Sequence, residues 1–154
     1  MRITIVAVGK LKERYWQDAA AEYLKRLGPY ASVDVVEVPD RDVTRDESRA
    51  LADEATAILR AIPDSSRVLL LDAGGATLSS DGLADHLSAL MVGGVSHVTF
   101  IIGGAAGVDA SVRDRAAERI SLGSMTWPHQ MVRVMLLEQV YRAFRIMRGE
   151  PYHR

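Results

Sequence analysis

Residues 97–107 read His97-Val98-Thr99-Phe100-Ile101-Ile102-Gly103-Gly104-Ala105-Ala106-Gly107. The first six residues form a short, mostly apolar run, and all the residues after it are glycine or alanine. A short apolar run that ends at glycines is typical of a strand buried on both faces, as strands are in parallel sheets. We therefore predict a buried strand over His97–Ile102 that ends in a glycine-rich loop.

Further apolar stretches predict strands, and helical patterns lie between them. The strands are expected at Arg2–Val8, Val33–Val38, Val68–Leu71 and Ile120–Leu122. The helices are expected at Glu13–Leu27, at Asp46–Ile62, from Ser79 or Ser80 to Met91, from Asp109 or Ser111 to about Glu118, and at Met131–Met147. A turn at Gly74-Gly75 is expected to close the strand over residues 68–71. This strict alternation predicts a single α/β domain over residues 1–154, with a parallel sheet covered on both faces.

Composition limits the classes of protein that the chain can represent. Of its 154 residues, 48% are hydrophobic and 25% are charged, as in an ordinary soluble domain. Cysteine is absent, which excludes disulfides and thiolate metal sites. No apolar run reaches membrane length, and the first strand lacks the features of a signal peptide. We therefore expect a cytoplasmic protein with no membrane partner.

The charge of the chain is small but unevenly distributed. A net charge of −1 argues against a generic nucleic-acid binder. Residues 129–154, however, carry five arginines and two glutamates. A modest basic region of this kind can contact phosphate locally without strong non-specific affinity.

Three of the predicted strands end in small residues, at 71–75, 102–107 and 122–126. The carboxyl ends of parallel strands meet at one edge of the sheet, where open α/β folds bind their ligands. Glycine lets backbone N–H and C=O groups approach such a ligand closely. None of these loops has the spacing of a dinucleotide-binding motif or a P-loop, which disfavours a phosphate cradle. The sequence therefore predicts a backbone-lined pocket for an uncharged or zwitterionic nucleoside ligand.

The four histidines of the chain are scattered and lack metal-ligand spacing, so we expect no metal site. We expect His86 on a helix surface and His97 in a structural role. His129 follows Pro128 at the mouth of the expected pocket, and His153 lies in the tail, so both are candidates for function. The absence of a Gly-x-Ser-x-Gly motif argues against a nucleophilic hydrolase.

The last helix is apolar on nearly all sides, which predicts that a second copy of the chain covers part of it. Arg133 lies on an apolar side, where it must meet an anion or a carboxylate because an unpaired buried charge is costly. A role in function or in the interface is favoured for Arg133, and a structural glutamate partner remains open. Glu138, Arg142 and Arg145 share one narrow arc of the helix and are expected to form a solvated stripe.

Several segments together resemble a known family. They are residues 5–12 (Ile-Val-Ala-Val-Gly-Lys-Leu-Lys), 101–107 (Ile-Ile-Gly-Gly-Ala-Ala-Gly), 125–134 (Met-Thr-Trp-Pro-His-Gln-Met-Val-Arg-Val), 138–143 (Glu-Gln-Val-Tyr-Arg-Ala) and 151–154 (Pro-Tyr-His-Arg). They are similar to segments of the ribosomal large-subunit pseudouridine N3-methyltransferases, which belong to the SPOUT class of knotted methyltransferases. The resemblance covers essentially the whole chain. It implies a C-terminal trefoil knot, a homodimer, bent S-adenosylmethionine held by the knot loops, and methylation of N3 of a pseudouridine in 23S rRNA on the assembled ribosome.

The resemblance also implies which residues bind the cofactor. The family's positions fall here on Leu71, Gly103, Leu122, Gly123, Ser124, Met125, Thr126 and Trp127, and the glycine-rich loop adds Gly104 and Gly107. Many relatives carry Pro-Glu or Ser-Asn where this chain has Ala105-Ala106. We expect no loss of function from this difference, because the backbone does the binding.

Methyl transfer from a sulfonium to N3 needs positioning and a proton acceptor, and a nearby cation would stabilise the imide anion. The candidate catalytic residues are His129, Arg133, Tyr152, His153 and Arg154. Two other classes stay open. One is a non-enzymatic nucleoside- or nucleotide-binding module that uses the same pocket, and the other is a flavodoxin-like redox protein, which would carry a coloured flavin.

Overall fold

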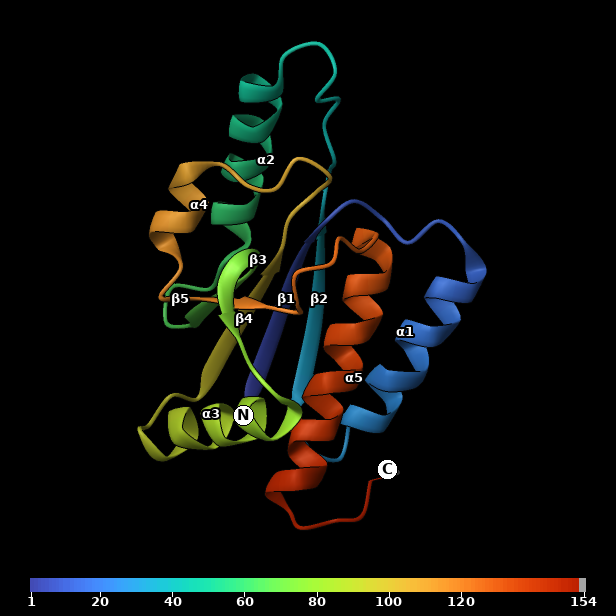
Figure 1. Ribbon diagram of the computed structural model, residues 1–154, viewed down its shortest axis with the longest axis vertical. Helices are drawn as coiled ribbons and strands as arrows, with labels where there is room; N and C mark the ends of the chain where they lie inside the picture. The colour runs from blue at the N-terminus through green and yellow to red at the C-terminus, as the bar shows by residue number, and fades with distance from the viewer. Residues whose placement is uncertain (153–154) are drawn as a thin grey trace.

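The computed structural model describes residues 1–152 and has a central sheet of five parallel strands (Figure 1). The strands are β1 (Arg2–Val8), β2 (Ser32–Val38), β3 (Arg67–Thr77), β4 (His97–Ile102) and β5 (Glu118–Ser121). Their order in the sheet is β2-β1-β4-β3-β5, and each of these pairings is parallel. The parallel sheet expected from the sequence is therefore confirmed.

Helices cover both faces of this sheet. They are α1 (Arg14–Leu27), α2 (Glu47–Ala61), α3 (Ser80–Val92), α4 (Ala110–Arg115) and α5 (His129–Met147). Helices α1, α3 and α5 pack on one face, whereas α2 and α4 pack on the other (Figure 1). No helix within residues 1–152 is long and apolar enough to cross a membrane.

The buried strands fill two separate cores with alternate side chains. From β1, Ile3 and Ile5 belong to the core under α1, α3 and α5, whereas Val6 and Val8 belong to the core under α2 and α4. All residues of β4 are buried. Because successive side chains of a strand point to opposite faces, a strand covered on both sides is apolar over most of its length. Each large side chain buried in this way contributes roughly 1.5–3 kcal/mol, which explains why uninterrupted apolar runs mark these strands.

The prediction of a turn at Gly74-Gly75 is wrong. Instead, β3 leaves β4 after Leu71 and pairs again with β5 from Ala76 onward, after a shift in register. A Cβ atom on Gly75 would lie 2.6 Å from the carbonyl carbon of Arg119 in β5. Glycine is therefore required here by the close approach of two backbones and not by a turn.

The start of β5 also differs from the expectation. The strand begins at Glu118, two residues before the apolar Ile120, and α4 accordingly ends early, at Arg115. One carboxylate oxygen of Glu118 lies 2.9 Å from Nη2 of Arg67, and the other lies 2.8 Å from Nε2 of His86. His86 is therefore half-buried and paired, which corrects the expectation of a surface histidine. A charged residue can occupy this position in the sheet because its carboxylate is paired with residues that are distant in the sequence. A local sequence pattern does not reveal these partners.

The close approach at Gly75 gives a test of stability. Gly75→Ala would place a methyl group against the Arg119–Ile120 backbone, so the free energy of unfolding is expected to fall by roughly 1–3 kcal/mol. Gly74→Ala is the matched control, because the nearest neighbour of its Cβ would be Oδ1 of Asp72 at 3.6 Å. Urea denaturation followed by circular dichroism measures both variants. Equal stability of the two would contradict the assigned backbone contact.

Candidate active site

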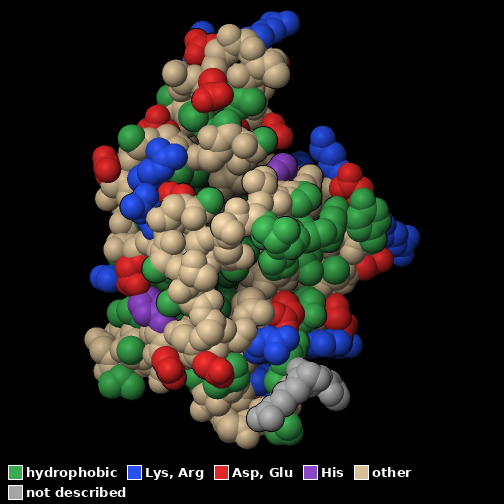
Figure 2. Space-filling view, in the orientation of Figure 1, with side chains coloured by type: hydrophobic (Ala, Val, Ile, Leu, Met, Phe, Trp, Pro, Cys, Tyr) green, Lys and Arg blue, Asp and Glu red, His purple; other side chains and the backbone are tan. Residues whose placement is uncertain are grey.

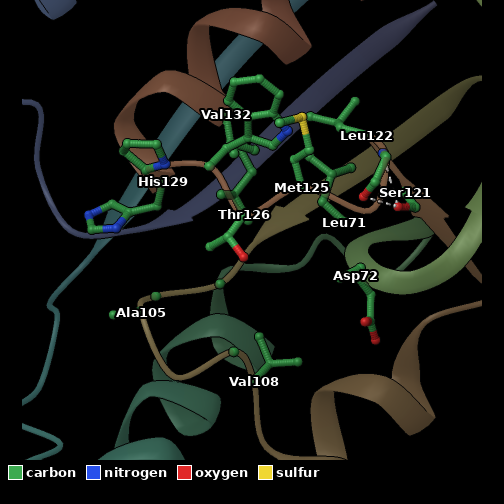
Figure 3. A pocket seen from close by; sticks show the side chains of 18 of the residues that line it. Leu71, Asp72, Ala105, Val108, Ser121, Leu122, Met125, Thr126, His129 and Val132 are labelled. Carbon is green, nitrogen blue, oxygen red and sulfur yellow. Dashed lines mark hydrogen bonds between the residues drawn. The ribbon is translucent and has the colours of Figure 1, made fainter.

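A cavity of about 600 Å³ lies at the carboxyl edge of the sheet, where β3, β4 and β5 end. Its walls come mainly from three segments, residues 71–73, 102–108 and 121–129. Figure 3 shows the side chains of these segments around a common space, with Thr126 opposite Ala105 and Val108. Small and apolar residues make up most of the wall, so much of the surface offered to a ligand is backbone.

Two glycines of the wall are needed for their backbone conformation. Gly107 has φ +82° and Gly123 has φ +113°, values that other residues rarely adopt. Gly107 also donates a backbone hydrogen bond to Gly104 at 3.1 Å, which closes the loop after β4 into a compact turn. A Cβ on Gly103 would lie 2.8 Å from Val108, inside this turn. The loop is therefore folded so closely that position 103 has no room for a side chain.

Ionisable groups stand on two sides of the cavity. His129 begins α5, which starts two residues earlier than the expected Met131. Across the cavity, Asp72 follows the buried part of β3, and its Oδ2 lies 3.7 Å from Nε of Arg113 in α4. Figure 3 shows His129 and Asp72 at opposite sides of the space. A ligand in the cavity would thus lie between a histidine and an ion pair.

The structure brings most of the predicted cofactor residues to this cavity. Those that line it are Leu71, Gly103, Gly104, Gly107, Leu122, Gly123, Met125, Thr126 and Trp127. Ser124 lies in the same loop but does not line the cavity, and its side chain is exposed. Among the predicted catalytic residues, His129 lines the cavity, whereas Arg133 and Tyr152 do not. His153 and Arg154 lie outside the described residues.

Arg133 is buried at the ends of β1 and β2, with 2% of its surface exposed. Its Nη2 donates a hydrogen bond of 2.8 Å to the carbonyl oxygen of Gly9, and its Nη1 lies 3.5 Å from Oε1 of Glu37. Burial lowers the pKa of the guanidinium, and the Glu37 carboxylate acts in the opposite direction. The glutamate partner that the sequence left open is therefore present.

The expectation of a solvated stripe on α5 is wrong. Oε1 of Glu138 lies 2.6 Å from Nη2 of Arg142, and both side chains are largely buried. The same Oε1 accepts a hydrogen bond of 2.9 Å from the hydroxyl of Tyr152, whose ring lies 4.2 Å from the Arg142 guanidinium. Arg145 donates a hydrogen bond to the hydroxyl of Tyr141. The returning tail covers the stripe, which a helical pattern alone cannot reveal.

Tyr152 packs against α5 of the same chain, away from the cavity of that chain. Burial and the hydrogen bond to Glu138 raise the pKa of Tyr152 to about 12, so the phenol remains a donor at neutral pH. Glu138 follows His129 by nine residues, a distance of about 13 Å along α5. Tyr152 could therefore act in a cavity only by leaving this position or by reaching the cavity of another chain.

His97 has the structural role that its position predicted. It is buried at the start of β4, and its Nε2 lies 2.9 Å from Oγ1 of Thr4 in β1. Burial lowers the pKa of His97, and the positive charge of Arg2 adds to this effect. Within residues 1–152, no group of three or more histidine, aspartate or glutamate side chains is arranged to hold a metal ion.

Sequence reasoning missed two charged residues of the wall, Asp72 and Arg113. Asp72 directly follows Leu71, which was predicted to line the pocket, so its place at the end of a buried strand was an available signal. Arg113 lies on the short helix α4, and only the packing of that helix against α2 brings it to the cavity.

A parallel sheet whose glycine-rich loops enclose a backbone-lined cavity at its carboxyl edge defines an α/β protein that binds a nucleotide-like cofactor. The family model described as "Predicted SPOUT methyltransferase" matches residues 1–153, and the chain belongs to this family. SPOUT methyltransferases use S-adenosylmethionine as the methyl donor, which is the cofactor expected from the sequence.

Solved structures resemble this fold. A protein from Haemophilus influenzae described as a probable methylase family protein is 14% identical, with a TM-score of 0.57 over 99% of this chain and 70% of that chain. A protein from Legionella pneumophila, described as a "putative methyltransferase" in complex with the bound cofactor SAM, is 13% identical, with a TM-score of 0.48 over 93% of this chain and 66% of that chain. At such identity, the first likeness concerns the fold alone.

Thr126 offers a way to fill the cavity without touching the core, because it is exposed and points into the space in Figure 3. Thr126→Trp is expected to abolish binding of S-adenosylmethionine, since the indole would occupy the volume that the ligand needs. Thr56→Trp, on the exposed side of α2, is the matched control and should bind normally. Isothermal titration calorimetry measures both. Normal binding by Thr126→Trp would exclude this cavity as the cofactor site.

Proposed function

We propose that this protein transfers a methyl group from S-adenosylmethionine to N3 of a pseudouridine in 23S rRNA on the assembled ribosome. Family membership supports methyl transfer, and the sequence resemblance supports the particular base and RNA. The observation that carries the proposal is the cavity itself, in which the loops after β3, β4 and β5 meet beside His129. An RNA substrate within ribosomes would make the protein cytoplasmic.

The chemistry of the cavity fits S-adenosylmethionine. Adenine needs an apolar slot with backbone hydrogen-bonding groups, and loops 102–108 and 122–127 offer both. When bound, the cofactor supplies an electrophilic methyl group on a sulfonium. The residues of the chain would then hold the cofactor, exclude water and accept the proton of N3.

Within this proposal His129 and Arg133 have different tasks. His129 lines the cavity and is the group that can accept the N3 proton or hydrogen-bond to the base. A Cβ on Gly9 would lie 3.6 Å from Nε2 of His129, so the Gly9 backbone adjoins this ring. Arg133 binds the Gly9 carbonyl and thereby acts as a positioning residue for the wall beside His129.

The neighbourhood of His129 also suits an RNA substrate. Lys10 and Lys12 follow Gly9 and are exposed, as is Arg14 at the start of α1. The exposed cations of this segment can contact the phosphates that flank a target base. This local arrangement supports an RNA substrate despite the slightly negative charge of the whole chain.

The trefoil knot and the homodimer are part of the proposal. For the knot, β3 pairs with β5 on both sides of its register shift, and the chain leaves β5 to form α5 on the opposite face from α4. For the dimer, the chain exposes 8637 Å², more than the about 7,700 Å² typical of a monomer of its 16.9 kDa. Apolar side chains gather over α1 and α5 in Figure 2, and Tyr15 of α1 is 64% exposed.

Ribosomes from cells that lack this protein provide the test of the reaction. Purified protein and labelled S-adenosylmethionine should add one methyl group to a pseudouridine of 23S rRNA in such ribosomes. Mass spectrometry of nuclease fragments locates the methylated base and distinguishes N3 from other positions. Free 23S rRNA and separate large subunits serve as comparison substrates.

The outcomes separate the alternatives for the same pocket. Binding of the cofactor without its consumption on any ribosomal substrate would favour the non-enzymatic nucleotide-binding module. Transfer to another nucleotide or to protein would keep the enzyme class and overturn the proposed substrate.

Mixed dimers test whether the tail acts on the partner's cavity. One subunit carries Thr126→Trp, with a blocked cavity and an intact tail, and the other lacks residues 152–154, with an open cavity and no tail. Each protein alone should be inactive, and their co-expressed mixed dimer should regain activity because it holds one complete site. A subunit with both changes is the control and should restore neither partner. An active tail-less protein, or mixed dimers without activity, would contradict action in trans.

A further inference from the structure

We propose that Asp72 and Arg113 bind the amino-acid end of the methyl donor, Arg113 through its carboxylate and Asp72 through its ammonium group. The inference rests on the proposed function, because it assigns one part of S-adenosylmethionine to one side of the cavity. It adds two side chains to a site that is otherwise formed largely by backbone.

Charge is unevenly distributed in the cavity. Among the described residues that line it, Asp72 and Arg113 are the carboxylate and the guanidinium, and the remainder, apart from His129, are uncharged. S-adenosylmethionine has one end that carries both a negative and a positive group, and charged groups are costly to bury without partners. The side of the cavity with Asp72 and Arg113 can supply both partners together.

The geometry of the Asp72–Arg113 pair leaves polar atoms for a ligand. Oδ1 of Asp72 accepts a 2.9 Å hydrogen bond from the backbone N–H of Gly74, which fixes the carboxylate at the cavity wall. Oδ2 lies 3.7 Å from Nε of Arg113 and 3.5 Å from Nη1 of Arg119. Both separations exceed a normal hydrogen bond, so the pair retains donors and an acceptor for a ligand. The guanidinium fork can bind a carboxylate with two parallel hydrogen bonds.

The cavity is divided into a charged side and an apolar side. Asp72 and Arg113 form the charged side, which can take the amino-acid end of the ligand. The apolar, backbone-lined remainder of the cavity is left for the adenosyl group, with His129 on the far side.

Asp72 could instead bind the ribose hydroxyls, as acidic residues do in dinucleotide-binding folds. The two assignments differ in one measurable respect. 5′-Methylthioadenosine keeps the adenine and the ribose of the cofactor and lacks the amino-acid end, whereas S-adenosylhomocysteine has all three parts. A contact to the amino-acid end therefore affects only the second ligand.

The experiment measures the affinity of both ligands by calorimetry for the wild-type protein and for Asp72→Asn, Arg113→Met and Arg119→Met. Arg119→Met is the matched control, because Arg119 neighbours the same carboxylate but does not line the cavity. We expect Arg113→Met to weaken S-adenosylhomocysteine about tenfold, as for the loss of a hydrogen-bonded charge pair at a half-exposed site. Asp72→Asn should also weaken it. Both variants should bind methylthioadenosine like the wild type, which also reports that their cavities are folded.

Parallel weakening of both ligands by Asp72→Asn or Arg113→Met would overturn the assignment in favour of a ribose contact or a general effect on the wall. An effect of Arg119→Met as large as that of Arg113→Met would overturn it in favour of long-range electrostatics. A wild-type protein that binds neither ligand would refute the proposed function and, with it, this inference. Wild-type binding of both ligands with unchanged affinities in the variants would refute the inference alone.

Discussion

The burial of β4 on both faces is the constraint on which the rest of the structure depends. All residues of this strand are buried, and its apolar side chains belong to the two cores. Its backbone becomes accessible at the carboxyl end, where Gly103 begins the loop. The neighbouring strand β3 and then β5 reach the surface at the same edge, and the cavity lies where these buried strands end. Binding chemistry is thereby confined to loops, while the sheet supplies rigidity.

Arg133 links this edge of the sheet to the last helix. Its guanidinium reaches from α5 to the Gly9 carbonyl after β1 and to Glu37 of β2. Loss of one partner would leave a buried charge uncompensated. The free-energy cost of such a charge is far larger than the stabilisation that the intact pair provides. The arrangement therefore fixes the start of α5, and with it His129, relative to the strand ends. A charged residue on an apolar helix face here connects the fold to the site.

The sequence predicts the parts of the structure that depend on local patterns. β1 and β4 are found where apolar runs predicted them, because burial on both faces leaves a continuous signal. The predicted turn at Gly74-Gly75 and the predicted helix end near Glu118 are wrong. The conformations of Gly75 and Glu118 depend on contacts with residues that are distant in the sequence. The same holds in the site. The glycine-rich loops are visible in the sequence, whereas the position of Arg113 at the cavity depends on the packing of α4 against α2.

The tail of the chain has a consequence for how the protein reaches its working form. Tyr152 is bound to Glu138 of its own helix, about 13 Å from His129 along α5. On the proposed mechanism, a single folded chain therefore lacks a complete active site, because its cavity needs the tail of a second chain. Catalytic competence would then depend on cellular abundance, since subunits must meet before any site is finished. At low concentration the chains would be monomeric and inactive, and only the dimer would act on the ribosome.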